Sequence, residues 1–259
     1  MTTAHRRTPL LLAGPAVLGL ALLVLPLVAL LERTPWRRLP HLLATEQVRQ
    51  ALWLSLRCTA GAVVLTVLLG VPLAWVLARS SLPGRRLLRA LVTVPLVLPP
   101  VVGGVALLLA FGRRGLLGGL LVETGAVPAF TSYGVVLAEA FVAMPFLVLT
   151  VEGALSSLDR GREDVAATLG ARPLRTLLTV TLPSIAPSVA AGTALAAARA
   201  LGEFGATITF AGSLPGVTQT VPLAVYQLLE NDPPAAYALS AVLLFVSIAL
   251  VAGLRARLR

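Results

Sequence analysis

Residues 58–78 have the sequence CTAGAVVLTVLLGVPLAWVLA, in which no side chain carries a charge. A helix needs about 20 mostly apolar residues to cross the hydrocarbon core of a bilayer, which is about 30 Å thick. This run is long enough to do so. It therefore predicts a membrane-spanning helix, and it provides the pattern with which the rest of the chain can be compared.

Five further runs are similarly long and mostly apolar, although one contains Glu139 and another contains Arg199 and Glu203, so the sequence predicts about six membrane-spanning helices. The predicted spans are residues 10–31, 58–78, 90–112, 132–151, 184–205 and 235–254. Arg6 and Arg7 precede the first run as they would in a secretory signal. That run is longer than the apolar part of a cleaved signal, which is about 7–15 residues, so we expect a retained helix. Residues 1–259 are expected to form one all-α, polytopic membrane domain.

The composition agrees with a membrane protein and excludes several kinds of enzyme. Hydrophobic residues make up 57% of the chain and charged residues 12%, whereas soluble domains carry roughly 25% charged residues. All 21 basic residues are arginine, so neither a P-loop lysine nor a Schiff-base lysine is available. The only histidines, His5 and His41, do not make a zinc or Ser/His protease site. We expect no catalytic residue, metal or cofactor, and any ATP would be hydrolysed by a partner.

The arginines also predict the orientation of the chain, because arginines in short loops concentrate on the cytoplasmic side. With the N-terminus in the cytoplasm, thirteen arginines fall in cytoplasmic segments and six in external loops. The cytoplasmic group is Arg6, Arg7, Arg79, Arg85, Arg86, Arg89, Arg160, Arg162, Arg172, Arg175, Arg255, Arg257 and Arg259, and the external group is Arg33, Arg37, Arg38, Arg49, Arg113 and Arg114. Both termini are therefore expected in the cytoplasm. The net charge of +10 comes from these membrane loops, so we expect no nucleic-acid partner.

The longest predicted cytoplasmic loop, residues 152–182, contains signals for a short helix. Asp159 is a good N-cap residue, and Gly170 can adopt the left-handed conformation that ends a helix. Pro173 then suits the first position of a new helix. The short helix could lie on the membrane surface, or it could insert into a groove on a soluble partner. The residues alone leave both interpretations open.

This loop resembles the EAA motif of importer-type ABC-transporter permeases. That motif consists of Glu-Ala-Ala, three further residues, Gly, nine further residues, an aliphatic residue, any residue and then Leu-Pro. In this chain the same spacing is found for Asp164-Val165-Ala166, Gly170 and Val180-Thr181-Leu182-Pro183. Asp164 and Val165 depart from the motif, and Glu163, one position earlier, could share the acidic role. The resemblance implies that this loop couples the chain to an ABC ATPase subunit. The coupling residues would be Glu163, Asp164, Ala166, Ala167, Gly170, Leu182 and Pro183.

A second resemblance, to molybdate and sulfate permeases, concerns the end of the fifth run and the segment after it. The segments 200–207 (ALGEFGAT), 210–212 (FAG) and 215–226 (PGVTQTVPLAVY) are similar to that group, and the last is more similar to molybdate permeases. Further segments with the same resemblance are 111–115 (FGRRG) and 141–146 (FVAMPF). The resemblance implies a type I ABC importer permease fold and import of molybdate or tungstate, with sulfate or thiosulfate as the alternative. It also implies a homodimer in the bilayer, two ATPase subunits and an extracytoplasmic oxyanion-binding protein.

An anion in transit must be held weakly enough to leave, which disfavours a cluster of buried arginines on its path. Residues 204–229 carry no charge but offer hydroxyls, among them Thr207 and Thr209. These could pass an oxyanion along, or they could serve only in helix packing and turns. Arg199 and Glu203 are four residues apart and can pair, either as a structural pair or near a gate. Glu139 lies close in sequence to the kink-prone Pro145, and we expect it to have a structural role.

Two other classes of protein compete with an ABC permease. An ion-coupled secondary carrier usually shows repeated halves and broken helices at its binding site. The two halves of this chain show no convincing repeat, and six spans are few for such a carrier. An intramembrane enzyme is disfavoured because the predicted spans contain no histidine, lysine or paired acids.

Overall fold

The structure is a computed structural model that describes residues 10–159 and 161–257, and within these residues the secondary structure is helical, without strands. Five helices are long and apolar enough to cross a membrane, or six if one bent pair counts as a span. This confirms the predicted all-α, polytopic class. The five long elements are α1 (Leu10–Arg33), α3 (Glu46–Arg79), α7 (Ser132–Ser157), the segment from α9 (Pro173–Thr176) through η2 (Leu177–Thr181) to α10 (Leu182–Leu201), and α13 (Pro233–Arg257).

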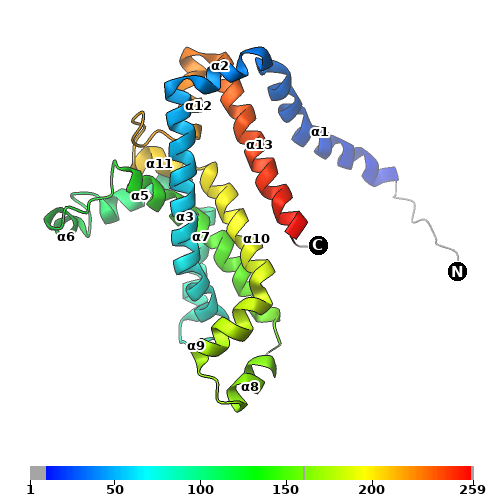
Figure 1. Ribbon diagram of the computed structural model, residues 1–259, viewed down its shortest axis with the longest axis vertical. Helices are drawn as coiled ribbons and strands as arrows, with labels where there is room; N and C mark the ends of the chain where they lie inside the picture. Colours follow the sequence, from blue (N-terminus) through cyan, green and yellow to red (C-terminus); the bar gives the residue numbers. More distant parts are fainter. Residues whose placement is uncertain (1–9, 160, 258–259) are drawn as a thin grey trace.

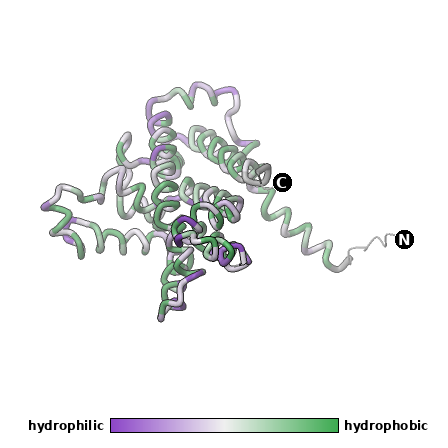
Figure 2. The backbone as a smooth tube through the Cα atoms, turned by 60° about the horizontal axis from the view of Figure 1, so that its bottom comes forward, coloured by the Kyte–Doolittle hydropathy of each residue, from purple (hydrophilic) through white to green (hydrophobic). Residues whose placement is uncertain are grey.

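Shorter helices connect these elements at the two ends of the molecule. At the upper end in Figure 1 the structure places η1 (Trp36–Arg38), α2 (Leu39–Ala44) and α12 (Val221–Asn231), and α11 (Gly205–Phe210) lies below them. At the lower end it places α8 (Gly161–Thr168) and α9. α6 (Gly118–Glu123) projects to one side. In Figure 2 α1 is mostly hydrophobic, and hydrophilic residues are prominent in the segment that joins α1 to α3.

The run at 90–112 folds as two helices rather than one. α4 (Arg85–Val97) and α5 (Pro100–Phe111) meet at an angle of 119°. Leu98 and Pro99 between them are extended, with ψ of 131° and 132°. Proline has no N–H to donate and disfavours a helical conformation in the preceding residue, so Pro99 and Pro100 end α4. The fifth run also ends earlier than predicted, because α10 stops at Leu201.

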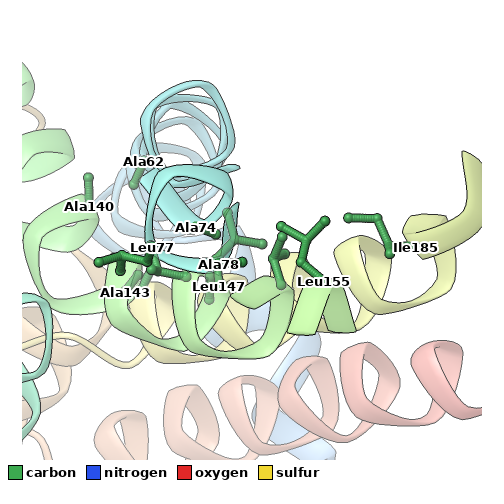
Figure 3. Close-up of a cluster of buried hydrophobic side chains, with 13 residues drawn as sticks. Ala62, Ala74, Leu77, Ala78, Ala140, Ala143, Leu147, Leu155 and Ile185 are labelled. Carbon is green, nitrogen blue, oxygen red and sulfur yellow. The ribbon is translucent and has the colours of Figure 1, made fainter. Parts of the chain in front are cut away.

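The core is built around α7, which packs against α3 on one side and α10 on the other (Figure 3). Leu77 of α3, Leu147 of α7 and Ile185 of α10 are among its buried side chains. α10 contributes mainly small residues to the interface. A Cβ atom on Gly192 would lie 3.0 Å from Leu147 Cδ1, so glycine permits a closer approach of the two helices than any other residue would.

α1 stands apart from this core and leads away from the body of the molecule (Figure 1). Its residues 12–29 are exposed, and α13 is the long helix that it contacts. The rings of Trp36, just beyond α1, and Phe245 of α13 lie 6.2 Å apart, centroid to centroid. Because residues 12–29 of α1 are exposed and mostly apolar, most of this helix is available for lipid or for another protein.

Candidate functional site

The predicted coupling loop forms a short helix at one end of the molecule. α8 begins just after Asp159, whose Oδ1 accepts a hydrogen bond from the Gly161 N–H at 3.1 Å. It ends before Gly170, which has a φ of +79° and donates its N–H to the Ala167 carbonyl at 2.9 Å. Pro173 is the first residue of α9. Gly170 and Pro173 therefore have the local structural roles that we predicted, whereas Asp159 lies one position before the N-cap position of α8, although its carboxylate still accepts from the first N–H of the helix.

Glu163 anchors α8 to the rest of the molecule. Its Oε1 accepts a hydrogen bond from Arg79 Nη2 of α3 at 3.2 Å and one from Thr181 Oγ1 of η2 at 2.9 Å. The Arg79 side chain is 8% exposed and that of Glu163 19%, and Thr181 is buried. Arg79 Nη2 also donates to the Leu158 carbonyl at the end of α7, at 3.4 Å. One carboxylate thus joins α8, α3 and the start of the fifth span.

The neighbouring motif residues point away from this anchor. Asp164 and Ala167 are exposed, and Ala166 is half-buried. Val165 is 60% exposed and Leu169, the residue after α8, is 83% exposed, so these two apolar side chains are not covered by any described residue. Small and apolar side chains on an exposed helix are the features by which a helix fits a groove on another protein.

The last motif residues lie where the fifth span begins. Leu182, half-buried, and Pro183, exposed, are the first two residues of α10, directly after the π-helical turn η2. A single π-helical turn is uncommon and is often found at functional sites. Here it carries Thr181, so the irregular turn and the Glu163 anchor coincide.

A second ion pair at this end was not predicted. Arg89 of α4 pairs with Glu152 of α7, and Arg89 Nε donates to Glu152 Oε1 at 2.8 Å. Glu152 is buried at the end of α7. An acid at the edge of an apolar run and arginines in another loop are visible in the sequence, but the sequence does not show which arginine is the partner.

The predicted pathway residues surround the break between α10 and α11. Glu203 is 1% exposed, and its Oε2 lies 2.6 Å from Arg199 Nη2, as the spacing of four residues predicted. Its Oε1 accepts a hydrogen bond from the Ala206 N–H at 2.7 Å. Glu203 therefore both pairs with an arginine and satisfies an N–H in the first turn of α11, where the positive end of the helix dipole favours a carboxylate.

The two candidate threonines of α11 differ in environment. Thr207 is fully buried, and its hydroxyl has no hydrogen-bond partner among the described residues. Thr209 is half-buried and donates to the Gly205 carbonyl at 2.9 Å. α11 packs tightly on α5, since a Cβ atom on Gly104 of α5 would lie 2.7 Å from the Ala206 carbonyl oxygen.

Glu139 lies in the middle of the buried helix α7 and is 1% exposed. Its Oε2 has no hydrogen-bond partner among the described residues, and neither does the buried hydroxyl of Thr59 on α3. An acidic side chain buried within a span is costly unless it is paired or neutral. Glu139 forms no ion pair with any described residue, so the structural role that we expected for it cannot depend on such a pair.

The comparisons with known proteins concern the family and the fold of this chain. Residues 70–259 match the family described as "Binding-protein-dependent transport system inner membrane component". The "Molybdenum transport system permease protein ModB" of Mycobacterium bovis is 51% identical over 94% of this chain and 92% of its own. The "Sulfate transport system permease protein CysT" of Salmonella typhimurium is 36% identical over 89% of this chain and 84% of its own. The fold matches a crystal structure of a bacterial ABC transporter that imports alginate, with a TM-score of 0.71 and 17% identity over 96% of this chain and 93% of that one. This chain belongs to the family of binding-protein-dependent transport system inner membrane components.

Proposed function

We propose that this chain is the membrane-spanning subunit through which molybdate, or tungstate, enters the cell. The observation that carries the proposal is the likeness to permeases named for molybdenum transport, which is higher and more extensive than the likeness to a sulfate permease. Sulfate or thiosulfate is the alternative substrate, because these anions share the tetrahedral shape and the charge of molybdate. An ion-coupled carrier is a poorer alternative, since the family depends on a separate binding protein.

The proposed orientation places both termini and α8 in the cytoplasm, with residues 1–259 as a single domain. The excess of arginines in the segments on that side supports it. The end that carries α8 also carries Arg79 and Arg89, each paired with an acid there. α2 and α12 would then face outward, where an extracytoplasmic binding protein would deliver the anion.

α8 would dock in a surface groove of a separate ATPase subunit, which supplies the energy. The exposed Val165 and Leu169 would enter that groove, while Glu163 holds the helix on the permease. Because Glu163 contacts both Arg79 and Thr181, a push on α8 would reach α3 and α10 together. Two copies of the chain would form a homodimer that encloses the pathway and receives one ATPase subunit each.

The anion would pass the region where α10 gives way to α11. Arg199 is already neutralised by Glu203, so it cannot trap an oxyanion as an isolated buried arginine would. Hydroxyls and backbone amides in and after α11, among them those of Thr207 and Thr209, would offer transient hydrogen bonds. Opening of this region would have to expose Thr207, which is buried in the present conformation.

Transport by the reconstituted complex tests the proposal. The full chain, its ATPase subunit and its binding protein are placed in proteoliposomes, and uptake of radioactive molybdate is followed with and without ATP. We expect uptake to require ATP and both partners. Unlabelled molybdate or tungstate should suppress this uptake more strongly than unlabelled sulfate does. Uptake that persists without the ATPase when an ion gradient is applied would contradict an ABC mechanism. Preferential uptake of sulfate would contradict the substrate assignment alone.

A further inference from the structure

A cavity of about 400 Å³ lies in the angle between α4 and α5, and its lining includes none of the candidate site residues. Its volume falls within the range of about 300–1,000 Å³ that is usual for pockets that hold small ligands. It is closed on its other sides by α3 and α7. The lining side chains are all apolar: Leu65, Leu69, Leu73, Leu88, Leu91, Val92, Pro95, Leu107, Phe111, Leu137, Ala140, Phe141, Met144 and Pro145.

The cavity opens on the flank of the molecule rather than toward its core. At its rim Leu69 of α3 is 53% exposed and Leu91 of α4 is 56% exposed. Leu107 and Ala140, in contrast, are buried. The exposed rim lies on helices that are expected to cross the bilayer. A pocket of this kind can be filled from the side by a hydrocarbon chain, and it offers no polar group to any other sort of ligand.

The same face of α4 carries positive charge at its first turn. Arg85, Leu88 and Val92 recur at the spacing of one helix face, and the last two line the cavity. With a rise of about 1.5 Å per residue, the Cα atom of Arg85 lies about 4.5 Å along the axis from that of Leu88. Arg86 is adjacent, and both arginines are exposed. Arg86, however, lies about 100° farther round the helix, on the side away from the cavity, so a headgroup above the cavity would meet the Arg85 guanidinium.

Arg85 and Arg86 have N–H donors available for an anionic ligand, whereas the donors of Arg89 are engaged by a carboxylate. Arg89 is paired with Glu152, whereas within residues 10–159 and 161–257 neither Arg85 nor Arg86 takes part in an ion pair. Arg85 Nη1 makes one long hydrogen bond, 3.4 Å, to the Ser80 carbonyl. A guanidinium has five N–H donors and binds phosphate oxygens in a fork geometry, so most of its donors remain for a ligand.

We propose that this cavity is a binding site for one anionic phospholipid, with an acyl chain between α4, α5, α3 and α7 and the phosphate on Arg85. The charge at one end and the purely apolar lining at the other match the two parts of such a lipid. The basic end is also the end expected in the cytoplasm, where anionic lipids attract basic residues close to the membrane surface. This site is independent of the transported anion.

Retention of defined lipids tests the proposal. The full chain is placed in nanodiscs of phosphatidylcholine and phosphatidylglycerol in equal amounts, released, and examined by native mass spectrometry. We expect one phosphatidylglycerol per chain to be retained in preference to phosphatidylcholine. Arg85→Ala should reduce that preference by about fivefold, since a basic residue near an anionic surface is worth about 1 kcal/mol.

Two controls separate the headgroup from the chain. Arg37→Ala removes the same charge from an exposed arginine in η1, and it should leave the preference unchanged. Leu88→Trp, or the milder Val92→Phe, should fill the cavity and reduce retention of both lipids without altering the preference. Equal retention of the two lipids by the natural chain would overturn the proposal. Equal losses from Arg85→Ala and Arg37→Ala would also overturn it, and so would retention that cavity filling does not change. A disulfide between two copies carrying Leu91→Cys would overturn it as well, because it would assign this face to a second copy.

Discussion

Replacing Glu163 by alanine should detach α8 from the rest of the chain. The substitution leaves the Arg79 guanidinium without a carboxylate and the buried Thr181 hydroxyl without an acceptor. Breaking a buried ion pair costs about 3–5 kcal/mol. The Glu163 side chain is 19% exposed, and Arg79 keeps its bond to the Leu158 carbonyl, so we reduce the expected cost to about 2–3 kcal/mol. The equilibrium between attached and detached α8 should shift by about 30- to 150-fold.

Asp164→Ala is the matched control, since it removes the same charge from the next position of the same helix turn. Asp164 is exposed and makes no ion pair with the described residues. Both substitutions lose the same favourable interaction with the helix dipole, so the difference between them isolates the anchor.

Hydrogen exchange of the α8 amides and molybdate uptake per ATP hydrolysed are the two measurements. Glu163→Ala should accelerate exchange and lower uptake per ATP, and Asp164→Ala should not accelerate exchange to a comparable extent. In an Arg79→Ala background the effect of Glu163→Ala should shrink, because no buried charge is left unpaired. If Asp164→Ala has the larger effect, or if the Arg79→Ala background changes nothing, the anchor is not what holds α8.

Four further substitutions test other parts of the structure. Gly104→Ala should destabilise the purified chain by about 1–3 kcal/mol and lower its melting temperature, because its Cβ would overlap α11, whereas Gly119→Ala, with open space around it, should not. Gly170→Ala should lower ATP-coupled uptake by straining the turn at a φ of +79°, and Gly170→Asn should lower it less, because asparagine tolerates that conformation. Thr207→Val should leave the melting temperature almost unchanged, because the hydroxyl has no partner among the described residues, while it reduces uptake; normal uptake would remove Thr207 from the pathway. Glu203→Gln should retain more uptake than Glu203→Ala, because the amide oxygen can still accept from the first turn of α11.

Much of the fold could be predicted because a bilayer imposes a length on its helices. The run 58–78 lies within α3, and Gly170 and Pro173 mark the loop turns as their backbone preferences require. α3 begins at Glu46, well before the apolar run, because a helix does not stop where hydrophobicity stops. The bend at Pro99-Pro100 had a visible signal, two prolines in succession, which a count of apolar residues does not register.

The anchoring contacts could not be predicted from the sequence. Glu163 and Arg79 are 84 positions apart, and Arg89 and Glu152 are 63 positions apart. A pairing at that separation depends on how α3, α4 and α7 pack. The pair Arg199–Glu203 could be predicted because its geometry is local, a spacing of four along one helix. The distinction between Glu163 and Asp164 has the same origin: adjacent acids look equivalent in a motif, and only the tertiary structure shows which of them faces Arg79.

α10 connects the two candidate sites, and this suggests how they would act together. It begins one residue after Thr181, which holds Glu163, and it ends two residues before Glu203, which caps α11. Its 20 residues make a rod about 30 Å long. Because Gly192 brings this rod into close contact with α7, a displacement of α8 cannot be absorbed there by loose packing. We expect the motion to be taken up instead at the break around Gly202, where α10 meets α11 and where the proposed pathway lies. In this importer the break in the fifth span would then be the hinge that converts movement of the coupling loop into opening of the pathway.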